Sequence, residues 1–174
     1  DSARALGQVR VTVTRDGGTT LQRAPWAVAV QDTRAIRGPQ ATLGIDEALN
    51  NVPGVMVANR YNYSVDQRVS IRGAGARANF GIRGVKVLVD GVPQSLPDGQ
   101  NQLTNVDLAS ISRVEVLRGS ASSLYGNGSG GVIAFETDRS ARDRLGATAR
   151  YESRSEEHTS ELQSLRHLVC RLLL

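Results

Sequence analysis

The sequence has very few of the residues on which most enzyme and metal sites depend. Among its 174 residues it has one cysteine, Cys170, and two histidines, His158 and His167. All three lie beyond Arg154, so the chain before that point lacks the parts of a disulfide, a thiolate metal site, or a Ser-His or Cys-His catalytic pair. We therefore expect no catalytic residues, no metal ligands and no cofactor.

Lysine, aromatic residues and long apolar runs are scarce as well. Lys86 is the single lysine, the arginines are scattered and the formal net charge is only +4, so we expect no nucleic acid as a partner. No apolar run reaches the ~18 residues of a transmembrane helix. The opening residues DSARALGQVR lack the apolar core of a signal peptide, and a mature exported chain would also lack it after cleavage.

The last segment, from Arg154 to Leu174, reads as translated DNA adapter. Its two ends, RSEEHTSELQS and LVCRLLL, are the in-frame translation of the two constant parts of a widely used sequencing adapter. We therefore expect residues 154–174 to be a sequencing-adapter artefact that truncates the native sequence. The alternative is a natural amphipathic helix, because Leu162, Leu165 and Leu168 have helical spacing.

Hydrophobic patterning in the rest of the chain predicts an α+β domain: a small mixed β-sheet with short helices and long apical loops. Apolar runs and alternation predict strands over 9–14, 26–30, 55–57, 69–72, 85–90, 114–117, 132–137 and 145–153. A helical stripe over 45–52 follows Thr42 as its expected N-cap and ends at Pro53-Gly54. Short helical turns are expected over 107–111 and 120–125.

Two glycine-rich stretches raise the question of a nucleotide site. Gly73-x-Gly75-x-x-Ala78 follows a predicted strand, as in a dinucleotide-binding unit, but residues 76–85 offer no crossover helix. The run GNGSGG at 126–131 follows a predicted helix and precedes a strand, which is the reverse of a phosphate-binding loop. We favour tight turns, with a dinucleotide-binding enzyme fragment that uses GAGARA at 73–78 as an alternative.

Five segments, taken in order, resemble the plug domain of a TonB-dependent outer-membrane receptor of the iron-complex or siderophore type. They are LGQVRVTVT, LGIDEALNNVPGV, QRVSIRGAG, VKVLVDGVP and VDLASISRVEVLRGSASSLYGNGSGGVIAFET. The similarity covers about residues 6–138, and its last segment is the most diagnostic. The turn PDGQ at 97–100 also resembles receptors for iron complexes. A free-standing periplasmic binding domain is a second alternative.

The resemblance implies a function, a location and partners. In this family the plug fills the lumen of the receptor's own barrel of about 22 strands in the outer membrane. It contributes to binding a small molecule such as an iron–siderophore, and its periplasmic N-terminus pairs with the energy-transducing protein TonB as an added strand. The implied boundaries are a flexible segment at 1–8, a TonB-box-like strand at 9–14, the plug at 15–138, and a linker with a candidate first barrel strand at 139–153.

The resemblance also implies three sets of site residues. The TonB-box-like residues are Val9, Arg10, Val11, Thr12 and Val13. The residues expected to latch the plug to barrel charges are Arg72, Glu115 and Arg118. The residues expected on ligand-facing loops are Arg60, Tyr61, Tyr63, Arg77, Phe80, Asp98 and Gln100. The alternatives are a solvated charge row on the strand at 113–118 and loop tyrosines without a binding role.

Overall fold

The chain divides into two compact units, residues 1–138 and 139–174, which are described separately. The structure is a computed structural model that describes residues 9–15, 18–36, 44–58, 67–78 and 81–138, and the backbone of 146–152 and 167–173. In the second unit, β10 (Gly146–Glu152) pairs antiparallel with β11 (His167–Leu173). The strand predicted over 145–153 is therefore present, and residues 167–173 form a strand where the alternative interpretation expected a helix.

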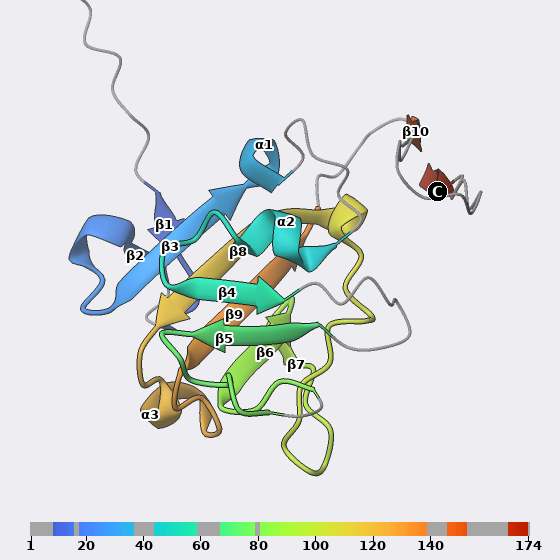
Figure 1. The fold of residues 1–174 in the computed structure, drawn as a ribbon. Helices are drawn as coiled ribbons and strands as arrows, with labels where there is room; N and C mark the ends of the chain where they lie inside the picture. Colours follow the sequence, from blue (N-terminus) through green and yellow to red (C-terminus); the bar gives the residue numbers. More distant parts are fainter. Residues whose placement is uncertain are drawn as a thin grey trace, which may run out of the picture. The chain divides into compact units, whose positions relative to one another are not determined.

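The first unit is built on one mixed five-stranded sheet (Figure 1). The strand order is β3 (Ala27–Asp32), β8 (Ile111–Arg118), β9 (Gly131–Thr137), β6 (Val85–Val89) and β7 (Val92–Pro93). The β6–β9 pair is parallel and the other three pairs are antiparallel. Strands β3, β6, β8 and β9 fall where apolar patterning predicted strands, whereas β7 was not predicted. The mixed sheet confirms the predicted fold class.

Short elements surround this sheet. Two small antiparallel pairs are formed by β1 (Arg10–Val11) with β2 (Thr19–Thr20), and by β4 (Val55–Ala58) with β5 (Arg68–Ile71). The helices are α1 (Thr33–Ile36), α2 (Ile45–Leu49) and α3 (Ser122–Tyr125), and the 3-10 turns are η1 (Leu21–Arg23) and η2 (Leu108–Ser110). Asp107 caps η2 by accepting a hydrogen bond from the Ala109 amide. No helix of the described residues is long and apolar enough to cross a membrane.

Each face of the five-stranded sheet carries its own apolar cluster, because successive side chains of a strand point to opposite faces. On β8, Val114 and Val116 belong to the cluster shared with α1, α2, β4 and β5, which we call the first face. Leu117 belongs to the opposite cluster, which we call the second face and which also contains Val11 and Val13. Figure 1 views the molecule from the first face, with β4 and β5 in front of the sheet.

Two predicted elements are shorter in the structure. The strand predicted over 9–14 is reduced to β1, because the chain turns after Val11 and the Arg15 amide donates to the Thr12 carbonyl at 3.0 Å. The helix predicted over 45–52 ends at Leu49, and Gly44 precedes it without a side-chain cap. The expected N-cap, Thr42, lies outside the described residues.

The turn between β6 and β7 ties the sheet together at one end. Asp90 and Gly91 have φ angles of 50° and 81°, the left-handed pair that a two-residue type I′ hairpin requires. The Asp90 carboxylate also accepts hydrogen bonds from the backbone amide and the hydroxyl of Thr137, at 2.9 and 2.7 Å. One aspartate thus closes the hairpin and fixes the end of β9.

Candidate functional site

Residues 9–15, which we call the N-terminal segment, lie on the second face of the sheet. Val11 and Val13 are 0% and 2% exposed and pack in the same cluster as Leu117 and Val132. Val9, in contrast, is 43% exposed. The TonB-box-like residues are therefore partly buried against their own domain, and do not form a free extended strand.

A buried carboxylate on the sheet binds the backbone of this segment. Glu115, on β8, is 0% exposed, and its Oε2 accepts hydrogen bonds from the backbone amides of Thr12 and Val13, both at 2.8 Å. Its Oε1 forms an ion pair with Arg113 at 2.7 Å. Arg113 also donates to the carbonyl of Arg10. The alternative of a solvated charge row does not hold for Glu115, because this side chain points into the layer between the sheet and the N-terminal segment.

Tyr125, at the end of α3, also binds the N-terminal segment. Its hydroxyl donates to the Val13 carbonyl at 2.8 Å, and the Arg15 guanidinium lies 4.7 Å from the ring centroid. Burial raises the pKa of Tyr125 above its ordinary value of 10.0, and the charge of Glu115 adds to this while Arg15 opposes it. The phenol therefore stays protonated at neutral pH and remains a hydrogen-bond donor.

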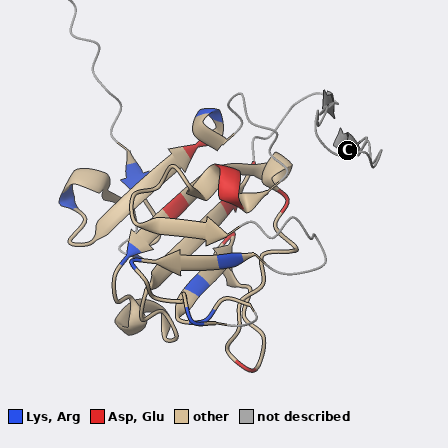
Figure 2. Cartoon of the chain, viewed as in Figure 1, with Lys and Arg blue, Asp and Glu red and all other residues tan. Residues whose placement is uncertain are grey.

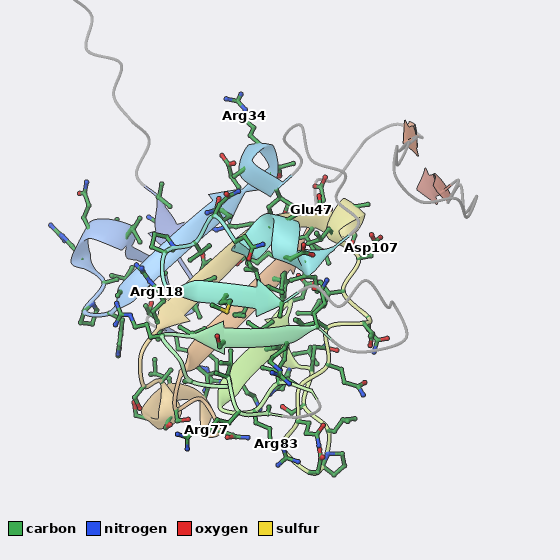
Figure 3. All side chains as sticks on the ribbon, in the orientation of Figure 1. Arg34, Glu47, Arg77, Arg83, Asp107 and Arg118 are labelled. Carbon is green, nitrogen blue, oxygen red and sulfur yellow. The ribbon has the colours of Figure 1, made fainter. Side chains whose placement is uncertain are left out.

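Arg72 and Arg118 meet at the Pro53–Gly54 turn, although they are far apart in the sequence. The Arg118 guanidinium donates to the Pro53 carbonyl at 3.0 Å and to the Ala27 carbonyl at 3.4 Å. The Arg72 amide donates to the Gly54 carbonyl at 2.7 Å, and the Arg72 side chain is exposed. Figure 3 labels Arg118 beside the start of β4. The structure thus places both predicted latch arginines at one corner of the domain.

The loop residues predicted to face a ligand divide into two groups. Arg77, Asp98 and Gln100 are described, whereas Arg60, Tyr61, Tyr63 and Phe80 lie outside the described residues. Arg77 and Arg83 line an open hollow of about 540 Å³, and Arg83 forms a 3.6 Å ion pair with Asp98 on the neighbouring loop. Figure 3 labels both arginines at the same end of the domain, opposite to Glu47 and Asp107.

The two ends of the β4–β5 pair are defined by its register, and residues 59–66 lie outside the described residues. Ala58 pairs with Arg68 at one end, and Val55 pairs with Ile71 at the end from which the loop after β5 departs. That second loop and the loop after β7 are joined by the bridge between Ile82 and Asn101. The structure therefore brings together the loop after β5, which carries Arg77, and the loop after β7, which carries Asp98 and Gln100.

The glycine stretches form close backbone contacts, and the dinucleotide alternative is wrong. A Cβ on Gly75 would lie 2.7 Å from the Val69 carbonyl oxygen and 3.2 Å from that of Arg83. The described residues between β5 and β6 contain no helix, and β5 pairs with β4 instead of β6. The Gly130 amide donates to the Gly84 carbonyl at 2.7 Å, so the GNGSGG run packs on the same turn.

Sequence reasoning missed Asn101 and Tyr125. Asn101 is 0% exposed, and its amide group donates to the Val85 carbonyl at 2.9 Å and accepts from the Val87 amide at 3.3 Å. It is one polar residue in a polar loop, so no local pattern marks it as buried. Tyr125 stood out only as a predicted helix end, because its partner Val13 is more than a hundred residues away.

Charges of both signs lie at both ends of the first unit. Figure 2 shows acidic residues on α2 and basic residues on α1 at one end of the sheet, and both signs on the loops at the other. Within the described ranges, no group of three or more His, Cys, Asp and Glu side chains is arranged to hold a metal ion. The fold and its contacts define a small α+β domain that docks its own N-terminal segment.

Comparison with known proteins identifies the family. Residues 20–133 match the family model described as the TonB-dependent Receptor Plug Domain, and the chain belongs to this family. The chain is 36% identical to a hemin receptor from Yersinia enterocolitica over 138 residues, which is 79% of this chain and 19% of that protein. It is 38% identical to a hemin receptor from Yersinia pestis over 128 residues, 73% of this chain and 18% of that protein.

Solved structures show the same fold. The siderophore receptor PirA from Acinetobacter baumannii superposes with a TM-score of 0.56 at 23% identity, over 75% of this chain and 20% of that chain. The chain spans about a fifth of the length of the curated relatives that it matches.

Proposed function

We propose that the chain is the gate of a TonB-dependent outer-membrane receptor that takes up an iron complex. The plug-family match over residues 20–133 carries this proposal, and the mixed sheet with both faces covered is consistent with it. In this role the domain occludes the lumen of a barrel in the outer membrane, contributes to ligand binding, and couples the receptor to TonB in the periplasm.

Hemin is the ligand that we propose to test first. The two curated relatives with the highest identities given above are both named hemin receptors, at 36% and 38% identity. The sequence pattern PDGQ had favoured a siderophore, and the structural neighbour PirA is named a siderophore receptor, but at 23% identity it supports the fold alone. Both ligands are iron complexes with anionic groups, which suit the exposed guanidinium groups of Arg77 and Arg83.

We assign the remaining site residues on the same basis. Arg72 and Arg118 lie together at the Pro53–Gly54 turn, where two guanidinium groups offer a wettable and reversible attachment to barrel carboxylates. Val9–Val13 is the segment that TonB engages by strand addition. Glu115 belongs with this segment, because its carboxylate binds Thr12 and Val13.

Growth on hemin tests the proposal. The receptor encoded by the intact gene is expressed in an iron-starved host that lacks its own heme receptors, in one strain with TonB and in a second strain without it. We expect hemin to restore growth only where both the receptor and TonB are present. The readout is growth yield against hemin concentration.

A ferric siderophore serves as the matched substrate control. Growth on the siderophore but not on hemin would support the gate function and would change the assigned ligand from hemin to a siderophore. Equal growth on hemin with and without TonB would contradict the coupling and, with it, the proposed function.

A further inference from the structure

The backbone of the N-terminal segment is already occupied by partners within the domain. Val9 accepts from the Leu21 amide at 2.8 Å, and Arg10 and Val11 pair with β2. The next two amides, of Thr12 and Val13, are those bound by Glu115. A partner strand needs such amides and carbonyls to be free along one edge.

The carbonyls and side chains of the segment are engaged as well. The Val13 carbonyl accepts from Tyr125 at 2.8 Å, and the Arg10 carbonyl accepts from Arg113. Val11 and Val13 are almost fully buried. In the observed position, the segment therefore offers a second protein neither a continuous edge nor its apolar side chains.

We propose that Glu115 is a positioning residue that clamps the N-terminal segment on the second face, and that this clamp must open before a partner strand can pair with residues 9–13. The part that concerns the partner rests on the proposed function; the clamp itself rests on the contacts of Glu115, Arg113 and Tyr125.

The chemistry of the clamp suits repeated opening. Hydrogen bonds from amides to an ionised carboxylate are among the stronger ones, so the closed state is well held. Opening does not leave Glu115 as an isolated charge, because Arg113 lies on the same strand and keeps its 2.7 Å ion pair. The Arg113 side chain is 26% exposed, so water reaches the pair when the segment leaves.

The substitution Glu115→Gln tests the clamp with almost no change in shape. A Gln side chain has one acceptor oxygen and one donor group, so it cannot serve both the Thr12 and Val13 amides and the Arg113 guanidinium. The matched control is Glu136→Gln, because the Glu136 carboxylate accepts from the Thr12 hydroxyl at 2.8 Å but binds neither amide. Tyr125→Phe is a second clamp variant that removes the hydrogen bond donated by the Tyr125 hydroxyl to the Val13 carbonyl.

Limited trypsin digestion of the full chain measures how often the N-terminal segment is released, because Arg10 and Arg15 supply cleavage sites within it. We expect Glu115→Gln to raise the cleavage rate after these arginines by about tenfold or more, and Tyr125→Phe by severalfold. Glu136→Gln should cleave as the parent chain does. Cleavage after Arg113, in the middle of β8, reports global unfolding and should stay unchanged.

The affinity of the soluble periplasmic domain of TonB for the same chains measures whether release of the N-terminal segment favours binding of the partner. We expect Glu115→Gln to bind about tenfold more tightly than the parent. Unchanged cleavage in both clamp variants would overturn the clamp. Faster cleavage with equal TonB affinity would overturn its role as a gate for the partner. Faster cleavage with no TonB binding by any chain would support the clamp and count against the proposed function.

Discussion

Glu115 lies between Val114 and Val116 on β8, and nothing in its immediate sequence distinguishes a buried carboxylate from a solvated one. Alternation correctly indicates that it faces away from the first apolar cluster. It does not indicate what covers the other face, which in this domain is a segment about a hundred residues earlier. The contacts of Glu115 therefore lie with the N-terminal segment and Arg113, whereas Arg72 and Arg118 both lie at the Pro53–Gly54 turn.

Gly75 provides a test at the same scale. We expect Gly75→Ala to lower the free energy of unfolding by about 3 kcal/mol or more, because its φ is +89° and the new Cβ would meet the carbonyl oxygens of Val69 and Arg83. The measurement is urea unfolding of the full chain followed by circular dichroism.

The matched control for this substitution is Gly73→Ala. Gly73 has a similar φ of +86°, but nothing lies within 4 Å of its added Cβ. Only the conformational cost of placing alanine at a positive φ, about 1–2 kcal/mol, should remain. Equal losses for the two variants would show that the close contact at Gly75 has no energetic consequence.

At the scale of elements, the strands with strong apolar patterning were predicted well. Strands β3, β6, β8 and β9 lie within a few residues of their predicted positions, because their sequences are rich in valine and other apolar residues. Strands β6, β8 and β9 also carry buried residues on both faces. The segment at 9–14 has equally strict alternation but forms only β1, since Glu115 binds the amides that would extend the ladder.

Substitutions of Asp90 test how the β6–β7 turn is joined to the end of β9. We expect Asp90→Ala to cost about 2–3 kcal/mol of stability, because it removes two hydrogen bonds to Thr137 and places alanine at a φ of 50°. Asp90→Asn should cost about 1 kcal/mol, since asparagine tolerates that φ and keeps an acceptor. Urea midpoints measure both changes, and an Asn variant as unstable as the Ala variant would contradict the explanation.

At the scale of the whole molecule, the candidate sites lie on different parts of one domain. The N-terminal segment covers the second face, the two arginines share the Pro53–Gly54 corner, and Arg77 and Arg83 lie on the loop end. The order of motifs in the sequence was sufficient to predict the family. It was not sufficient to predict which loops meet, because that depends on the crossing of the β4–β5 pair over the sheet and on the bridge to Asn101.

The structure of the intact receptor tests the central claim most directly. We predict that residues 9–138 lie inside the lumen of a barrel, with the guanidinium groups of Arg72 and Arg118 within about 4 Å of barrel carboxylates. In the ligand-free receptor, the Glu115 carboxylate should bind the amides of Thr12 and Val13, as in the domain described above. A domain that lies outside the barrel, with both arginines in solvent, would contradict the account.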